Sequence, residues 1–277
     1  MSTMLPRAAG SVDYVGGKEQ RPGGGRYGLN RSLATVVAGH VGQWRGSAVG
    51  IGAVVGLGCF PVKSMLGEER ERLVVDERGV AGDRLWALRH EDGKLGSGKN
   101  TRRFRRTPGM MEYDAVYEGG GPVVTTPDGE RLRPGDLRIA ELFGAGMELV
   151  REGEVSHQDA GAVSLVGTES LRALGELLGD ADPVDVRRLR KNIVVGTDEP
   201  WIEEDWVGRE ITFDGGLRLR VVRRIERCVM TTQAQRDLPA DHRILKTLTA
   251  TRGMCIGVYA DVVTPGTLAL GAEVTVR

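Results

Sequence analysis

Short β-forming runs divided by turn residues fill the chain from Ile51 onward, and they restrict the fold more than any other feature of the sequence. Early examples lie at residues 54–55, 73–75 and 85–88, and the sequence Pro127-Asp128-Gly129 marks a turn. Runs of this length and spacing are typical of sandwiches and barrels. The pattern therefore predicts a mainly β protein.

Further strands and a few helices are expected along the rest of the chain. The predicted strands lie at residues 113–117, 123–126, 193–195, 211–213, 217–225, 256–263 and 273–276. The predicted helices lie at residues 134–143, 168–178 and 242–249. Because long helices do not alternate with the strands, a β-barrel with a few helices fits better than a doubly wound sheet.

The helix at residues 168–178 has the clearest pattern of the three. An apolar face is predicted from Leu171, Leu174, Leu177 and Leu178. Thr168 is placed to cap the helix, and an acidic residue follows it in the first turn.

Charge and cysteine content exclude several classes of protein. Lysine plus arginine total 38 and aspartate plus glutamate total 38, so no overall field attracts nucleic acid. Cys59, Cys228 and Cys255 form no CxxC pair and are too few for a disulfide framework, a zinc ribbon or a plant-type iron-sulfur cluster. The apolar stretch at residues 33–42 is too short to span a bilayer, and no signal-peptide pattern is visible. A reducing cytoplasm is the expected location.

Residues 1–48 differ from the rest of the chain. They are rich in glycine, lack helical or strand periodicity, and carry six basic residues against two acidic ones, a net charge of +4. This composition predicts a disordered extension that is solvated or touches an acidic partner.

Two glycine-rich stretches imitate nucleotide-binding loops. Residues 50–56 have GxGxxxG spacing, but no strand precedes them and Pro61 follows where a helix should run. Residues 93–100 read GKLGSGKN, where Asn100 replaces the Ser or Thr that binds magnesium, and a basic run follows. A hairpin or loop is the better interpretation of this second stretch.

His157, Asp159 and the distant His242 provide the residue types of a two-histidine, one-carboxylate iron site. Spacing alone does not show that the three side chains meet, so this interpretation is rejected.

Cys228 is the strongest chemical signal in the sequence. It follows a probable strand and lies near Arg223, Arg224 and Arg227. Nearby cations favour the thiolate, the form of cysteine that binds metals and attacks electrophiles. A buried structural cysteine is the competing interpretation if this position is considered alone.

A series of short motifs along the chain resembles the MOSC family, named for the C-terminal domain of molybdenum cofactor sulfurase. The motifs are Phe60-Pro61-Val62-Lys63-Ser64, Gly82-Asp83-Arg84-Leu85-Trp86, His157-Gln158-Asp159-Ala160, Arg190-Lys191-Asn192-Ile193, and Arg227-Cys228 with Thr231-Thr232. More narrowly, they resemble the amidoxime-reducing and YcbX-like branch. The resemblance implies a MOSC N-terminal β-barrel-like domain at residues 52–150 and a MOSC domain at residues 151–277.

The resemblance also implies the molybdenum cofactor, a dithiolene-bound metal on a pterin that bears a phosphate. Such a site needs one soft thiolate and several fixed cations. Cys228 would be the metal ligand and the catalytic residue. The implied cofactor-binding residues are Lys63, Ser64, Arg84, Lys99, Arg190, Asn192, Arg227 and Thr231.

Two departures from the branch leave the substrate open. Residues 254–259 read MCIGVY where relatives usually have a Phe-Gly pair, and residues 233–235 replace the usual Asp-Pro turn. Cys255 lies in the first of these segments, so it is a candidate for a second sulfur relay close to Cys228.

By resemblance, the activity would be reductive removal of oxygen from an N-hydroxylated small molecule or a related oxide. No flavin or iron-sulfur motif is visible, so a separate ferredoxin, flavin or haem protein would supply the electrons. The alternative is a carrier that holds molybdenum cofactor, or passes persulfide sulfur from Cys228, without redox turnover. No nucleic acid partner and no membrane span are expected.

Overall fold

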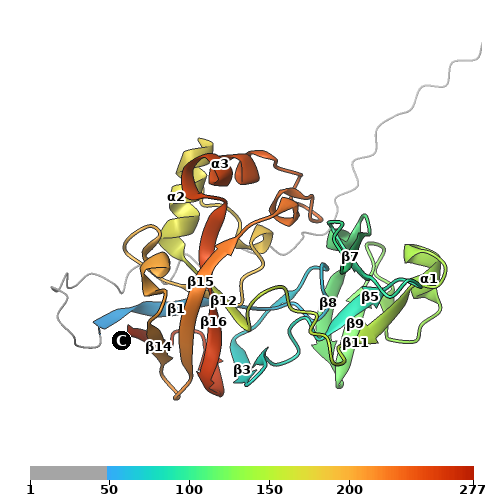
Figure 1. Cartoon of the computed structure of the whole chain (residues 1–277), viewed down its shortest axis with the longest axis horizontal. Coiled ribbons are helices and arrows are strands. Elements are labelled where there is room, and N and C mark those ends of the chain that lie inside the picture. The colour runs from blue at the N-terminus through green and yellow to red at the C-terminus, as the bar shows by residue number, and fades with distance from the viewer. Residues whose placement is uncertain (1–48) are drawn as a thin grey trace, which may run out of the picture. The chain divides into compact units, whose positions relative to one another are not determined.

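The computed structural model describes residues 49–277 (Figure 1). The expected disordered extension, residues 1–48, lies outside the described residues. In the part that is described, no helix is long and apolar enough to cross a membrane.

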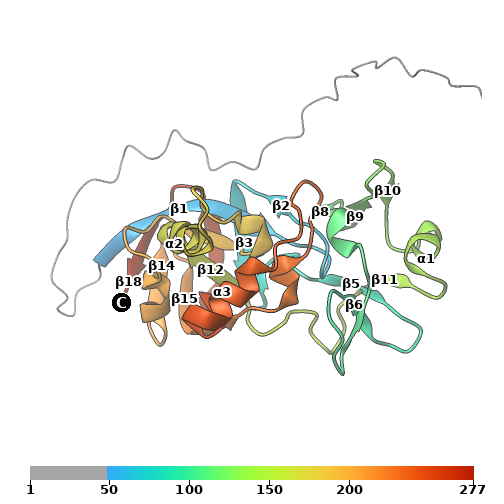
Figure 2. The ribbon, with the colours of Figure 1, turned by 90° about the horizontal axis from the view of Figure 1, so that it is seen from above.

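Seven strands of the described chain close into a β-barrel (Figures 1 and 2). Around the barrel they run β13 (Ile193–Val195), β12 (Val163–Gly167), β16 (Cys255–Thr264), β15 (Arg218–Glu226), β14 (Glu210–Phe213), β18 (Glu273–Val276) and β1 (Val49–Cys59), which pairs with β13. The β12–β13 pair is parallel and its neighbours are antiparallel. The prediction of a mainly β fold with a few helices is confirmed.

Strand β1 closes the barrel although it precedes the other barrel strands by about a hundred residues. It lies between β18 and β13, and its far end also pairs with β2 (Glu68–Glu69). Apolar side chains from all around the barrel fill the interior, including Leu57, Leu165, Leu219 and Val258. The division of the chain near residue 150 therefore cuts between segments that share one barrel, and it stays a proposal.

The segment between β1 and β12 forms smaller sheets beside the barrel. One sheet runs β11 (Glu148–Arg151), β5 (Trp86–Arg89), β6 (Leu95–Ser97), β7 (Phe104–Arg106), and another runs β10 (Arg131–Leu132), β9 (Gly121–Thr125), β8 (Asp114–Glu118). A third joins β17 (Gly266–Ala269), β3 (Arg72–Asp76) and β4 (Gly79–Val80). Residues 93–100 lie in the turn and strand after β5, in agreement with the hairpin interpretation of this glycine-rich stretch.

Helix α1 (Arg138–Phe143) is shorter than the predicted 134–143. Pro134 and Gly135 form a turn instead, and Gly135 has a φ of 90°, which excludes it from a helix. Asp136 then accepts a hydrogen bond from the amide of Arg138, 3.0 Å away. The Asp136 side chain therefore binds an amide of the first turn, although the N-cap residue is Leu137.

Helix α2 (Thr168–Leu178) has the predicted bounds, and Leu171 and Leu174 are buried as expected. Two details of the prediction are wrong. Leu177 is 47% exposed, because it lies on the edge of the helix away from the core. Thr168 does not cap the helix: Gly167 precedes it as the N-cap, and the Thr168 hydroxyl bonds to the backbone of Thr197.

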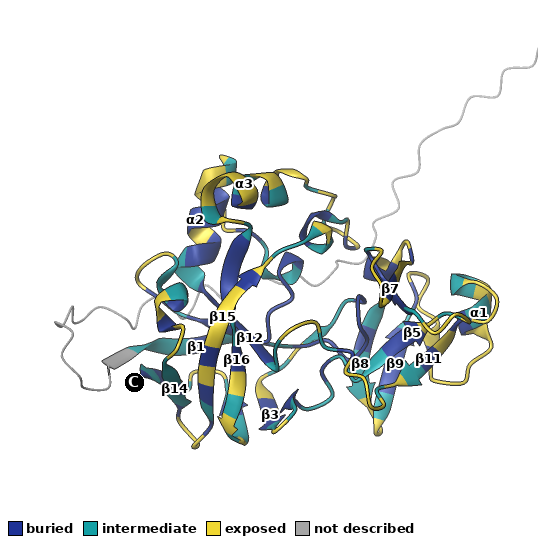
Figure 3. Ribbon diagram, in the orientation of Figure 1, coloured by how far each residue is buried: buried dark blue, intermediate teal, exposed yellow. Residues whose placement is uncertain are grey.

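Strand β15 carries the chain to Cys228. Its buried and exposed residues alternate until Val221, after which three consecutive exposed residues follow (Figure 3). Irregular pairing with β16 accompanies this change, between Val221 and Arg223 and again beyond Arg224. Such irregularities turn side chains away from the regular pleat. In β15 these irregularities leave Arg223 and Arg224 exposed on the outside of the barrel, just before the strand ends.

Candidate functional site

A pocket of about 840 Å³ lies where the end of β15 faces the small sheets. Its lining includes Lys63, Ser64, Arg84, Lys99, Arg190, Arg227 and Cys228, all of them predicted site residues. These seven residues come from segments up to 165 positions apart, as the distance from Lys63 to Cys228 in the chain shows. The fold therefore gathers most of the predicted site.

The pocket carries an excess of positive charge. Its cationic residues are Lys63, Arg84, Lys99, Arg190, Arg223, Arg224 and Arg227, and its acidic residues are Asp159, Glu204 and Glu226. Since the whole chain has no net charge, this excess is local. Tyr259 and Asp159 also line the pocket but were not among the predicted cofactor-binding residues, although Asp159 lies within one of the MOSC-like motifs.

Three of the pocket residues have a backbone conformation that is uncommon for residues other than glycine. Ser64, Arg84 and Arg190 have φ angles of 64°, 49° and 52°. Within residues 49–277 only Trp201, Arg236 and Met254 share a positive φ among residues with a side chain. Each such conformation costs about 1–3 kcal/mol and is often found at functional sites. Neither composition nor periodicity indicated this feature.

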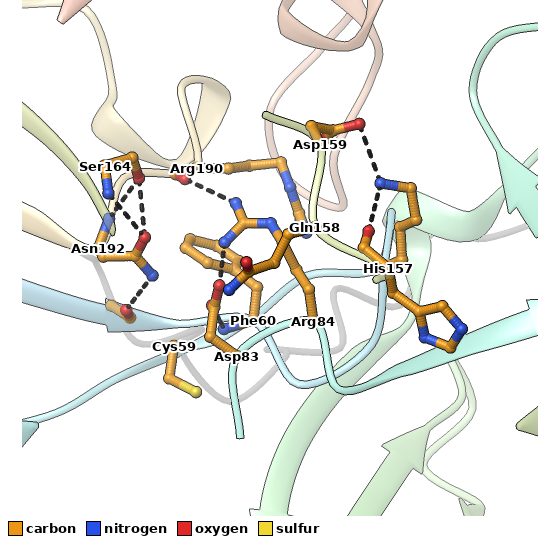
Figure 4. Close-up of polar contacts among 12 residues, drawn as sticks. Cys59, Phe60, Asp83, Arg84, His157, Gln158, Asp159, Ser164, Arg190 and Asn192 are labelled. Carbon is orange, nitrogen blue, oxygen red and sulfur yellow. Dashed lines mark hydrogen bonds and ion pairs between the residues drawn. The ribbon is translucent and has the colours of Figure 1, made fainter. Parts of the chain in front are cut away.

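Arg84 and Arg190 both pack against the ring of Phe60 (Figure 4). Their guanidinium carbons lie 5.0 Å and 4.4 Å from the ring centroid. Arg84 is paired with the carboxylate of Asp83, which also accepts the amide N–H of Phe60 at 2.8 Å. These contacts fix the two guanidinium groups before any ligand binds, which lowers the entropy lost on binding.

Arg190 lacks such a carboxylate in the described part of the chain. Its Nη1 donates to the main-chain oxygen of Met65. Burial, followed by the nearby charge of Arg84, lowers the pKa of Arg190 to about 9. An anion that enters the pocket would relieve both effects, because it would stabilise the charged form.

Lys63 lies at the floor of the pocket with only 3% of its surface exposed. Its Nζ donates to the main-chain oxygen of His157 at 2.9 Å and to the Asp159 carboxylate at 3.0 Å (Figure 4). Burial lowers the pKa of Lys63 to about 8, while Asp159 opposes the shift. Burial raises the pKa of Asp159, but the charge and hydrogen bond of Lys63 outweigh it and hold that pKa at about 2. The ion pair keeps both groups charged near neutral pH.

Cys228 is half-buried, lines the pocket and precedes the short 3-10 helix η5 (Val229–Thr232). Thr231, which does not line the pocket, donates from both its amide and its hydroxyl to the Cys228 carbonyl oxygen, at 3.1 Å and 3.0 Å. Thr231 therefore positions the cysteine backbone. This role differs from the direct cofactor contact that the resemblance implies.

Arg227 lies next to this cysteine and has an unused donor. Its Nη2 donates to the main-chain oxygen of Leu189 at 2.9 Å, whereas its Nε is buried with no hydrogen-bond partner in residues 49–277. A buried donor without a partner is costly. A thiol, a free donor and several fixed cations in one pocket match what a phosphate-bearing cofactor with a thiolate-bound metal requires.

Asn192 also lies outside the pocket lining, and its side chain is 1% exposed. Its Oδ1 accepts from the amide and the hydroxyl of Ser164, and its Nδ2 donates to the Gly58 carbonyl oxygen at 3.2 Å (Figure 4). Because these groups belong to β12 and β1, Asn192 links barrel strands behind the pocket. Its hydrogen-bonding capacity is used within the protein.

The other two cysteines differ from Cys228. Cys255 lines the same pocket, but it is buried and its Sγ donates to the Gly253 carbonyl oxygen at 3.4 Å; burial raises its pKa. Cys59 is the last residue of β1 and is fully buried in the core. All three cysteines are free. Over residues 49–277 no three His, Cys, Asp or Glu side chains are grouped so that they could hold a metal ion.

Comparison with known proteins identifies two domains. Residues 51–161 match the MOSC N-terminal beta barrel domain, and residues 140–275 match the MOSC domain. No protein with a curated description matches the sequence.

Two solved bacterial structures are among those similar to this chain. The YuaD protein from Bacillus subtilis is 17% identical, with a TM-score of 0.50 over 83% of this chain and 97% of that one. YiiM from Geobacillus stearothermophilus is 21% identical, with a TM-score of 0.32 over 42% of this chain and 54% of that one. The likeness to YuaD is a likeness of fold.

Proposed function

This chain is a MOSC protein, with a MOSC domain preceded by a MOSC N-terminal β-barrel domain, and because some members of that family bind molybdenum cofactor, we propose that its pocket holds this cofactor. Cys228 is the proposed thiolate ligand of the metal. Lys63, Arg84, Lys99, Arg190 and Arg227 are the proposed partners of the pterin phosphate, and Ser64 adds a hydroxyl. The observation that carries the proposal is the meeting of the Cys228 thiol with this set of fixed cations in one pocket.

The proposed reaction is the reductive removal of oxygen from an N-hydroxylated small molecule or a related oxide. It breaks the N–O bond, takes up two electrons and two protons, and releases the oxygen as water. When bound, the cofactor would supply the oxygen-atom and electron chemistry, which no amino-acid side chain provides.

The residues of the chain would bind and orient the cofactor. The buried guanidinium of Arg190 and the ammonium of Lys63 provide fixed positive charge, and Asp159 keeps Lys63 protonated near neutral pH. Thr231 holds the backbone that presents Cys228. Preorganised groups of this kind need not rearrange during the reaction.

The electrons are proposed to come from a separate ferredoxin, flavin or haem protein. The three cysteines of the chain are free, and residues 49–277 hold no group of three His, Cys, Asp or Glu side chains that could bind a metal ion.

An activity assay with an artificial donor tests the reaction. Protein expressed in a host that makes the cofactor is supplied with reduced methyl viologen and benzamidoxime, and formation of benzamidine is measured. The proposal expects turnover that is lost in Cys228→Ser and kept in Cys59→Ser, a matched buried cysteine outside the pocket. Stoichiometric cofactor without turnover on any N-hydroxylated substrate would favour the alternative, a cofactor or persulfide carrier that uses Cys228.

A further inference from the structure

A basic segment at residues 98–106 borders the pocket, and Lys99 is its one residue that the proposed cofactor site uses. Its arginines are Arg102, Arg103, Arg105 and Arg106, all exposed, and residues 98–106 contain no acidic residue. We call these four residues the basic rim.

The basic rim is anchored at the mouth of the pocket by Phe104. This ring is 7% exposed and lines the pocket. The cationic groups of Lys63, Lys99 and Arg103 lie 4.6, 5.4 and 5.2 Å from its centroid. Phe104 thus connects the exposed arginines directly to the cations of the pocket.

Contacts with the opposite wall hold the same segment in place. The Gly98 carbonyl oxygen accepts a hydrogen bond from Gln233 Nε2 at 3.1 Å, just beyond η5. Arg103 donates to the Ser156 carbonyl oxygen, close to Asp159. The segment therefore contacts both the loop after η5 and the loop before β12, and these contacts hold the basic rim beside the pocket.

Most of the positive charge of the basic rim is not neutralised within the described chain. Arg105 pairs with Asp92 at 2.7 Å. For Arg102, Arg103 and Arg106, no carboxylate of residues 49–277 lies in ion-pair range. A chain with equal numbers of basic and acidic residues thus concentrates free positive charge at this entrance.

We propose that the basic rim is the docking surface for the acidic face of the electron-donor protein, an inference that rests on the proposed function. A donor has to approach the pocket, and the basic rim is the exposed protein surface beside it. Complementary charge raises association rates by about 10 to 1,000-fold and orients the encounter. Nucleic acid fits less well, because the aromatic residue of this segment is buried and so provides no stacking platform.

Charge reversal tests the basic rim in the full-length protein, expressed in a host that makes the cofactor. The variant is Arg102→Glu with Arg106→Glu, and the matched control is Arg72→Glu with Arg151→Glu, two exposed strand positions outside the pocket lining with the same change in charge. The probe is an acidic plant-type [2Fe–2S] ferredoxin. Binding is measured by calorimetry, and oxidation of the reduced ferredoxin by stopped flow.

The expected result is a dissociation constant at least about tenfold higher for the rim variant at low ionic strength. The difference should disappear near 1 M salt, where the Debye length is about 3 Å. The control pair should change the constant less than about twofold, and the rate with reduced methyl viologen should stay unchanged in both. The neutral variant, Arg102→Gln with Arg106→Gln, should raise the dissociation constant by an intermediate amount.

Equal ferredoxin affinity in the rim and control variants, with both folded by circular dichroism, would overturn the inference. Tighter binding of a DNA or RNA oligonucleotide than of ferredoxin, lost on reversal of the basic rim, would also overturn it. The binding measurement requires no turnover, so it decides the inference even if the protein contains no molybdenum. A metal-free protein would contradict the proposed function alone.

Discussion

Arg84 donates a hydrogen bond from Nη2 to the main-chain oxygen of Arg190, 3.1 Å away and 106 positions later in the chain. This contact joins the turn after β4 to the segment before β13. Both residues have a positive φ, and both pack on Phe60. The two arginines of the pocket are therefore fixed relative to each other, in both backbone and side chain.

Arg190→Gln should weaken retention of the cofactor. The substitution removes a positive charge from the pocket and its charge-assisted hydrogen bonds, each worth about 1.5–3 kcal/mol, or about 10 to 100-fold in affinity. The ratio of pterin to protein after dialysis measures the effect, with Lys246→Gln on α3 (Arg243–Arg252) as the control. An unchanged ratio in a folded Arg190→Gln protein would remove Arg190 from the anion site.

Glu152→Gln should lower stability in a pH-dependent way. Burial raises the pKa of Glu152, but hydrogen bonds from Arg78 and from the His157 amide lower it to about 2. A depressed pKa contributes stability above the unfolded value, near 4.3, that is lost as the pH falls toward 2. The variant should lose about 2–4 kcal/mol of unfolding free energy at pH 7. Urea unfolding should show this gap closing between pH 5 and pH 2, and a constant gap would contradict the account.

The His157→Gln variant should lose less stability in mild acid than the wild type does. The His157 ring is 5% exposed and its Nδ1 has no partner among residues 49–277, and burial lowers its pKa to about 4. The unfolded chain binds a proton below about pH 6.5, whereas the folded protein binds it only near pH 4, so folding weakens between these values. Over this window the wild type should lose about 2–3 kcal/mol more than the variant. Parallel stability curves for the two proteins would contradict a lowered pKa of His157 in the folded protein.

Gly257→Ala should destabilise the barrel beside the pocket. Gly257 has a φ of 74°, and a Cβ atom there would contact the Leu165 carbonyl oxygen and lie 2.7 Å from Lys191 Nζ. Lys191 is itself buried and donates to the Ile256 carbonyl oxygen at 3.1 Å. Because neither backbone nor lysine has room to move, we expect a loss of more than about 2 kcal/mol. Gly253→Ala, at an open helix end, is the control and should cost about 1 kcal/mol.

Local patterns were sufficient to predict most individual elements. Helix α2 has the predicted bounds, and β15 covers residues 218–226 against a predicted 217–225. These elements are long and strongly periodic, so their type follows from neighbouring residues alone. Leu177 shows the limit, because the width of the buried face depends on what packs against it.

The closure of the barrel by β1 could not be predicted in this way. Its partners, β13 and β18, lie more than a hundred residues further along the chain, and periodicity does not specify which strands pair. The site shows the same limit. The motifs indicated Arg84 and Arg190, but only the fold shows that Asn192 is used for linking strands and that Asp159 faces Lys63.

The most direct test is the molybdenum content of purified wild type and Cys228→Ser, measured by elemental mass spectrometry together with the fluorescence of oxidised pterin. Both proteins are expressed in a host that makes the cofactor, and Cys59→Ser is the control. The account predicts near-stoichiometric metal and pterin in the wild type and the control, and a marked loss of metal in Cys228→Ser. Absence of both metal and pterin from folded wild type would contradict it.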